Sequence, residues 1–253
     1  MAKNNLFSRC WLTLAILTVA WVTRGHNSQA NTTKIPLPPV EDLAFQIQVT
    51  IGQLEKVLKQ AEDYDEDKAT QVEQKANMLA VLALTLGKHD QDHLLQKAAP
   101  ELIKTARILA ATAPEFDGAQ AALNQIQKAL QTTGNAKELE WEPVADIAIL
   151  MQQVPIVNNR LRRGVNSRRF TKSIEKNAAL SAALVAMSQA SQLDTSYCDG
   201  EQQEIEWQKI CADMGLAAME VNHAIRKKDQ AAAKLGLDRI VKTCDACHHT
   251  FRD

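Results

Sequence analysis

Residues 244–252 read Cys-Asp-Ala-Cys-His-His-Thr-Phe-Arg, and they close the last amphipathic stretch of the chain. At about 100° per residue, an α-helix places positions i, i+3, i+4, i+7 and i+8 on one face. The side chains with this spacing are Cys244, Cys247, His248, Phe251 and Arg252. His249 points about 100° away from them and is expected to be solvated. The segment therefore predicts a helix with two thiols, an imidazole, an aromatic ring and a guanidinium group on one face.

The order C-x-x-C-H is the attachment pattern of c-type haem. Each thiol adds across one haem vinyl group, and the adjoining histidine binds the iron. Cys244 and Cys247 are thus the candidate attachment residues, and His248 is the candidate iron ligand. A thioredoxin-like C-x-x-C would need a preceding strand, and a structural zinc site would need four nitrogen or sulfur ligands. The sequence offers neither a strand pattern nor a second ligand pair.

The rest of the sequence predicts an all-α protein. Glycine and aromatic residues are few, while Ala, Leu, Gln, Glu and Lys are abundant. Clusters of glycine, proline and aspartate divide the chain into eight amphipathic stretches of similar length, joined by short loops. Such loops favour antiparallel neighbours, and hence two tandem up-down four-helix bundles. The expected helices are 40–62, 66–87, 92–112 and 116–133, then 142–164, 168–192, 201–227 and 229–251.

The two halves resemble each other, which favours a duplication. The stretch at 129–137 matches the stretch at 240–248 at a shift of 111 positions. In that register Thr133, Ala136 and Lys137 stand where the second half has Cys244, Cys247 and His248. The alternative is that any two Ala- and Leu-rich helices align passably. The expected domains are 31–137, a bundle without a haem motif, and 138–253, a bundle with one haem.

Residues 1–30 have the pattern of a signal peptide. A basic start precedes a short apolar run, and Ser28-Gln29-Ala30 is a candidate cleavage site. The run is shorter than the roughly 20 residues of a membrane span, so no stable span is expected after cleavage. The expected location is the periplasm, where disulfides are permitted. Cys198 and Cys211 could pair there or stay separate thiols.

The net charge of the chain without residues 1–30 bears on whether nucleic acid is a partner. Residues 1–30 hold three basic residues and no acidic one, so 26 basic and 30 acidic side chains remain, a net charge of −4. This mild acidic balance argues against a nucleic-acid partner.

The ending C-x-x-C-H-x-x-Phe-Arg resembles that of class II cytochromes c, the cytochrome c′ family. The resemblance covers residues 142–253, and it reaches 40–137 only through the duplication. It implies a cytochrome c′-like bundle with one covalently attached haem c. It also implies that Phe251 packs on the porphyrin edge and that Arg252 meets a haem propionate.

Members of that family differ in what faces the second side of the iron. Some use an aliphatic or aromatic side chain and leave five-coordinate iron that takes NO or CO, and others use a methionine of the first helix. Met151 is the matching candidate here and is expected to be the second iron ligand. Its alternative role is core filling. Pro155 cannot donate to the Met151 carbonyl, so a kink or break is expected nearby.

Other chemistry-bearing residues have a simpler interpretation. Met187, Met214 and Met219 are expected in the core, as are Trp141 and Trp207, although these two rings could line a haem pocket. His223 is expected on a polar face, and His89 with His93 lacks further metal ligands. The basic run Arg160, Arg162, Arg163, Arg168, Arg169 and Lys172 is either a docking patch for an acidic partner or a solvated loop.

The sequence predicts a periplasmic monohaem c-type cytochrome that transfers single electrons to a redox partner protein. No nucleophile–base pair accompanies the haem motif, so no enzymatic activity is predicted. One alternative is a five-coordinate haem protein that senses or sequesters NO or CO. Another is an adaptor that uses the haem-less bundle. A homodimer, or an internal pseudo-dimer of the two bundles, is expected from the resemblance.

Overall fold

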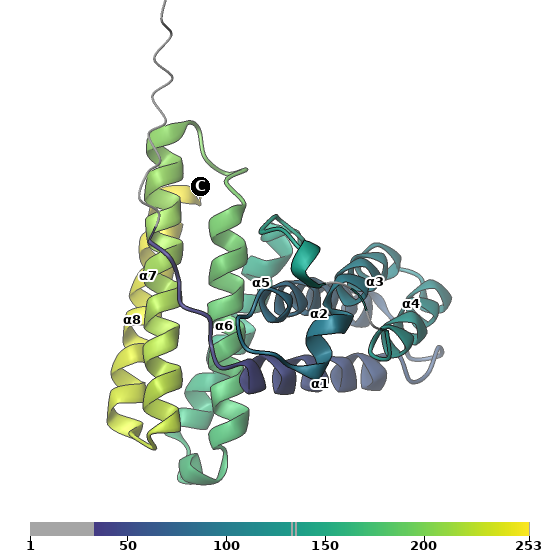
Figure 1. The fold of residues 1–253 in the computed structure, drawn as a ribbon, viewed down its shortest axis with the longest axis horizontal. Coiled ribbons are helices and arrows are strands. Elements are labelled where there is room, and N and C mark those ends of the chain that lie inside the picture. Colours follow the sequence, from purple (N-terminus) through teal and green to yellow (C-terminus); the bar gives the residue numbers. More distant parts are fainter. Residues whose placement is uncertain (1–32, 133, 135, 253) are drawn as a thin grey trace, which may run out of the picture. The chain divides into compact units, whose positions relative to one another are not determined.

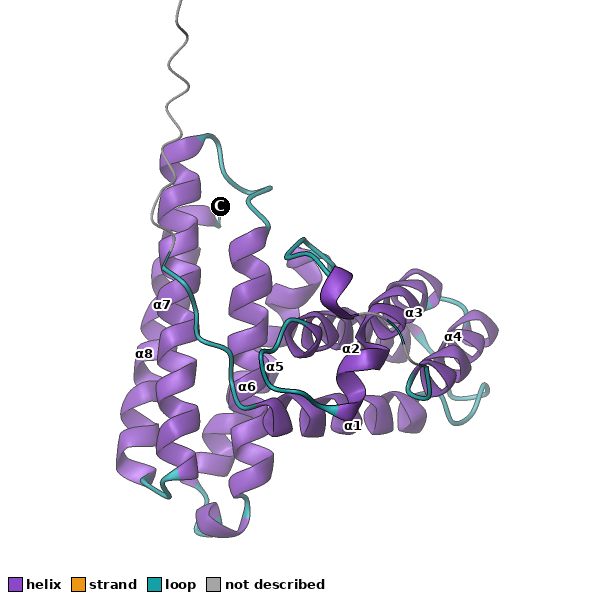
Figure 2. Cartoon of the chain, viewed as in Figure 1, coloured by secondary structure: helices purple, strands orange, loops and turns teal. Residues whose placement is uncertain are grey.

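The computed structural model describes residues 33–132, 134 and 136–252, which form helices and loops and no strand (Figure 2). The predicted all-α class is therefore confirmed. The predicted signal peptide lies outside the described residues. Among the described helices, none has the length and apolarity that a bilayer crossing requires.

Eight α-helices follow one another along the described chain, with three short 3-10 helices between them (Figure 1). The first four are α1 (Val40–Val57), α2 (Glu66–Gly87), α3 (Ala99–Thr112) and α4 (Phe116–Ala129). The second four are α5 (Ile147–Asn166), α6 (Ile174–Leu193), α7 (Glu201–Arg226) and α8 (Gln230–Phe251). The 3-10 helices are η1 (Leu94–Ala98), η2 (Ala136–Glu138) and η3 (Phe170–Lys172).

Aspartate side chains begin three of the helices. Asp65, Asp146 and Asp229 each accept a hydrogen bond from a backbone N–H in the first turn of α2, α5 and α8. This satisfies donors that have no partner inside the helix. Gly200 precedes α7 with a φ of 99°, a conformation that favours glycine.

These end signals explain where the observed bounds depart from the expected ones. The fifth helix begins at Ile147 rather than at 142, because Asp146 caps it. The sixth begins at Ile174 rather than at 168, because Phe170–Lys172 forms a 3-10 turn first. The first helix ends at Val57, five residues before the expected 62.

The helices α5 to α8 contact one another in sequence, and α8 also contacts α5. In the first half, α1 to α4 likewise contact one another in sequence. Two helices, α2 and α6, lie at the centre of the packing. Each has one stretch that is buried without interruption, Gln74–Gly87 in α2 and Asn177–Ser191 in α6. Because both stretches are buried on all sides, these two helices form the middle of the core.

The two halves share this core. The helix α1 packs against α6, and α2 packs against both α5 and α6. One cluster of buried apolar residues runs through both halves, and residues 31–253 form one compact unit. Hydrogen bonds also cross the boundary: the Gln74 amide donates to Gln152 Oε1 at 3.0 Å, and the Asp146 N–H donates to Asn77 Oδ1 at 2.8 Å.

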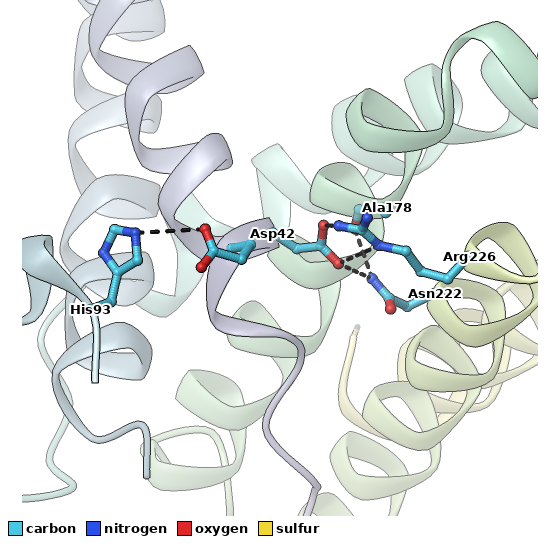
Figure 3. Close-up of polar contacts among 6 residues, drawn as sticks. Asp42, His93, Ala178, Asn222 and Arg226 are labelled. Carbon is cyan, nitrogen blue, oxygen red and sulfur yellow. Dashed lines mark hydrogen bonds and ion pairs between the residues drawn. The ribbon is translucent and has the colours of Figure 1, made fainter. Parts of the chain in front are cut away.

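A buried polar network reinforces the contact between α1 and α7 (Figure 3). The Asp42 carboxylate on α1 is 1% exposed, and it pairs with the Arg226 guanidinium on α7. Asn222 Nδ2 donates to Asp42 Oδ2 at 2.9 Å and to the Ala178 carbonyl of α6 at 3.0 Å. A buried carboxylate needs such partners because its desolvation is costly. The network therefore fixes the start of α1 against the second half.

The segment before α1, residues 33–39, runs along α6 and α7 (Figure 1). Ile35 is buried against Gly215 of α7, where a Cβ would lie 2.7 Å from its Cγ2 atom. The amides of Gln189 and Gln192 donate to the carbonyls of Ile35 and Thr33 at 3.3 and 3.2 Å. The first described residues thus belong to the packing of the second half.

Candidate functional site

Two adjoining pockets lie between α5, α7 and α8. Their volumes are about 440 and 260 Å³, and the larger lies within the size range of small-molecule sites. We call the first the outer pocket and the second the inner pocket. The residues that line both are Met151, Pro155, Trp207, Cys247 and His248. Because both pockets share these walls, they form one site.

The α8 wall carries the attachment motif. Cys247 and His248 line both pockets, Cys244 lines the inner one, and Phe251 and Arg252 line the outer one. His249 is exposed and lines neither. The helical spacing therefore brings together the five residues expected on one face. The two thiols and Phe251 are half-buried, whereas His248 and Arg252 are exposed.

The α5 wall faces this motif. Ile147, Met151, Pro155 and Asn158 line the site at helical spacing. Met151 is half-buried, and it lines both pockets together with His248. The expected break at Pro155 does not occur, because α5 continues without interruption from Ile147 to Asn166. Met151 therefore stays on the same helix face as Asn158.

Three aromatic side chains, Trp207, Phe251 and Tyr197, pack together at one end of the site. The Trp207 ring is 3% exposed, and its indole N–H donates to the Ser191 carbonyl at 2.7 Å. It meets Phe251 edge to face at 5.1 Å between ring centroids, and Tyr197 stacks on it at 6.3 Å. Trp207 thus belongs to both the core and the pocket wall. Trp141 is 39% exposed and lines neither pocket.

The four described cysteines are separate thiols, and Cys198 and Cys211 form no disulfide. Burial, followed by the neighbouring Cys244 and Cys198, raises the pKa of Cys247 to about 11. Burial raises the pKa of Cys244 as well, and that of Cys211 more strongly. Thiols with raised pKa values stay protonated at neutral pH, so they are poor nucleophiles there. Cys211 lines the inner pocket beside both attachment thiols.

The residues of the site fit a covalently held haem. The walls are mostly apolar, as a porphyrin ring requires, and Arg252 is the only Lys or Arg among the described residues that line them. Two thiols and an imidazole stand on one wall, and a thioether stands on the wall opposite, which is the donor set of a His/Met c-type centre. Asn158 is 8% exposed and its Oδ1 has no hydrogen-bond partner, so the inner pocket keeps one unsatisfied polar atom.

The remaining candidates lie elsewhere. Met187 and Met219 are buried outside both pockets, while the buried Met214 lines the inner one. The His89 Nε2 atom lies 3.0 Å from the Pro38 carbonyl oxygen, and His93 Nδ1 accepts from the Leu95 N–H. His223 is exposed. Within residues 33–252 as described, no group of three or more His, Cys, Asp or Glu side chains could hold a metal ion.

The basic run lies away from the site. None of Arg160, Arg162, Arg163, Arg168, Arg169 and Lys172 lines either pocket. These residues occupy the end of α5 and the turn before α6. Arg160 instead reaches the first half, where its Nη1 atom donates to Gln53 Oε1 at 3.4 Å.

In the first half, the segment that aligns with the motif is not a continuation of a helix. The last helix of that half, α4, ends at Ala129, whereas α8 continues to Phe251. Ala136 begins a short 3-10 helix, and Thr133 lies outside the described residues. The part of α8 that carries the two thiols therefore has no helical counterpart in α4.

Sequence reasoning did not single out Tyr197, Asn158 or Cys211 as parts of the site. Asn158 follows Met151 by seven residues, so its helical spacing could have indicated a place on the same face. Tyr197 lies in a loop, and no periodicity connects a loop residue to a helix face. Its place in the site depends on where the loop between α6 and α7 folds.

No protein-family model, no curated protein and no solved structure matches this chain. The resemblance to class II cytochromes c therefore rests on the residues of the motif and on the helix pattern, and it stays a prediction.

Proposed function

We propose that this protein is an exported monohaem c-type cytochrome that transfers single electrons. In this proposal Cys244 and Cys247 hold the haem, and His248 and Met151 bind its iron from opposite sides. One observation carries the proposal: the motif on α8 and Met151 on α5 line the same apolar pocket, and the two helices are in contact.

The residues of the pocket would hold and orient the group. The two half-buried thiols fix it to α8, and the rings of Phe251 and Trp207 exclude water from one end. Arg252, at the exposed rim, supplies the cation that a propionate would pair with. When bound, the haem supplies a one-electron redox centre, and a thioether opposite an imidazole raises its reduction potential.

We further propose that the eight helices form two tandem four-helix bundles that arose by duplication and that pair as an internal pseudo-dimer. The contacts of α1 with α6 and of α2 with α5 support this idea, since each joins the first helix of one half to the second helix of the other. The contact of α2 with α6 joins the two second helices. A self-complementary interface has this reciprocal pattern.

The signal-peptide pattern of residues 1–30 supports an exported location, namely the periplasm, with a redox protein as the partner. The decisive experiment is to produce the full chain together with a cytochrome c maturation system. We expect a coloured protein whose mass exceeds that of the mature polypeptide by one haem. Colourless protein with the bare polypeptide mass would overturn the proposal.

The role of Met151 is tested by Met151→Leu, with Met214→Leu as a matched control in the wall of the inner pocket. Leucine keeps the volume but removes the sulfur donor. We expect Met151→Leu to change a low-spin absorption spectrum into a high-spin one that responds to NO, and Met214→Leu to leave the spectrum unchanged. A spectrum that is high-spin in the wild type and unchanged in Met151→Leu would favour the five-coordinate, gas-binding alternative.

A further inference from the structure

An exposed aromatic ring lies at the mouth of the outer pocket. Tyr197 is 50% exposed, lines this pocket and stacks on the buried Trp207. Ile205, one helical turn into α7, is a second exposed apolar side chain, at 38%. Large apolar side chains at the surface are informative when they lie beside a functional pocket.

The segment that carries these two side chains is rich in carboxylates. Between Asp194 and Gln208 the chain carries five acidic residues and no lysine or arginine; the acidic residues are Asp194, Asp199, Glu201, Glu204 and Glu206. Three of them lie close to the Cys198 thiol: after burial, the charges of Glu204, Asp199 and Asp194 raise the pKa of that thiol. Cys198 in turn packs against Trp207 and Cys211. The negative charge is therefore concentrated beside the pocket.

We propose that residues 194–206 form the docking surface for a basic redox partner, a protein that presents lysine or arginine side chains around an apolar centre. This inference rests on the proposed function. A docking surface with an apolar centre and a charged rim combines close contact with fast encounter. Tyr197, at the pocket, provides the apolar centre, and the carboxylates provide the rim.

The position of this surface relative to the pocket favours it over the basic run as the contact. Electron transfer between proteins slows steeply as the distance between redox centres grows, so a partner must dock beside the pocket. Along α5, Arg162 lies seven residues beyond Pro155 of the outer pocket, about 10 Å at the helical rise, and it lines neither pocket. Tyr197, in contrast, is part of the pocket lining itself.

The first test uses two small electron carriers of opposite charge, hexaammineruthenium(II) and ferrocyanide, with the haem-loaded full chain. We compare the wild type with a triple variant, Asp199→Asn, Glu201→Gln and Glu204→Gln. The matched control at the other end of α5 is Arg162→Gln, Arg163→Gln and Arg169→Gln. We expect the acidic triple variant to slow the cationic carrier by about 3- to 10-fold at low ionic strength, and the control to change its rate less than twofold.

The second test reads binding rather than electron transfer. A basic cytochrome c is cross-linked to the protein with a carbodiimide, and the linked peptides are mapped. We expect the links to fall within residues 194–206 and to decrease in the acidic triple variant and in Tyr197→Ser. Two outcomes would overturn the docking surface. One is cross-links that map outside residues 194–206, and the other is an electron-transfer rate with hexaammineruthenium(II) that the acidic triple variant leaves unchanged. A protein without covalent haem would instead overturn the proposed function, so the two failures are distinguishable.

Discussion

Asp42 places a carboxylate in the core at the contact between the two halves of the chain. Arg226 of α7 compensates its charge, and Asn222 of the same helix donates a hydrogen bond to it. Ion pairs of this kind contribute little net stability when compared with apolar residues, but losing one partner leaves a buried charge. The network therefore makes the fold sensitive to changes at Arg226.

We predict that Arg226→Met destabilises the protein by about 2–4 kcal/mol, because the Asp42 carboxylate stays buried without its counter-charge. The measurement is urea unfolding followed by far-UV circular dichroism. The double variant Arg226→Met with Asp42→Leu should recover most of the loss, since no charge is then left uncompensated. A single variant as stable as the wild type would show that the pair is not needed.

Lys75 on α2 is a buried cation. Its ammonium donates to the Gln71 carbonyl oxygen at 3.4 Å. Burial, followed by the charge of Arg160, lowers the pKa of Lys75 to about 8. Below pH 8 the folded and unfolded states are both protonated, and the folded state carries the cost of the buried charge. Between about pH 8 and 10.4 only the unfolded state keeps the proton, so this cost disappears as pH rises.

We therefore predict that Lys75→Met is more stable than the wild type at pH 7 by about 1–3 kcal/mol, and that this advantage shrinks as pH rises to about 10. Unfolding midpoints at pH 7, 8.5 and 10 give the comparison. An advantage that is constant over this range would mean that the charge of Lys75 is not the cause.

At the residue scale the sequence predicted the motif well, because helical spacing alone relates Cys244 to Arg252. Met151 was suggested by the resemblance to class II cytochromes c, and it lines the same pockets as the motif. The sequence could not relate Asp42 to Arg226, which are 184 positions apart. A charged residue within the apolar stripe of Val40, Leu43 and Ala44 is the one local sign that Asp42 needs a partner.

At the scale of helices, the close approach of α7 and α8 depends on Gly236. A Cβ at this position would lie 2.6 Å from Val221 Cγ2 and 3.4 Å from the Val221 backbone nitrogen. The absence of a side chain therefore lets α8, which carries the haem motif, lie close to α7.

We predict that Gly236→Ala destabilises the protein by about 1–3 kcal/mol through overpacking. Gly52→Ala is the control, because nothing lies within 4 Å of a Cβ there. Alanine at Gly52 should stabilise α1 by about 0.5–1 kcal/mol, since it favours the helix over the unfolded chain. Thermal unfolding of both variants gives the signs. Two substitutions that change stability in the same direction would contradict the close contact.

Helix existence was predictable from periodicity, and helix ends were less so. The expected fifth helix started too early because Asp146 competes for the cap position. The central place of α2 and α6 was not predicted, because all eight stretches were expected to be amphipathic and so to keep one solvated face each.

At the scale of the molecule, the shared core makes the two halves dependent on each other. Apolar faces of α1 and α2 cover α5 and α6, and one core cluster includes residues of both halves. The short loops between the helical stretches predicted two bundles, yet the sequence could not predict how the two halves pack against each other, because contacts between distant helices leave no periodic signal.

We predict that the described chain unfolds in one transition. Trp141 and Trp207 report on the second half, whereas far-UV circular dichroism reports on helices of both halves. The two signals should change at the same urea concentration. The isolated segment 138–253 should associate or aggregate, because the faces of α5 and α6 that α1 and α2 cover would be exposed. A monomeric, soluble segment with two separate transitions in the full chain would contradict the shared core.

Residues 33–39 and the start of α1 can complete their contacts only after much of the later chain has been synthesised. These residues are synthesised long before the residues whose side chains hold them. The partners are Gln189, Asn222 and Arg226. Most helical proteins complete their contacts locally and fold fast, whereas here the final docking must wait for nearly the whole polypeptide. A nascent chain halted before residue 226 would therefore lack the Arg226 partner of Asp42.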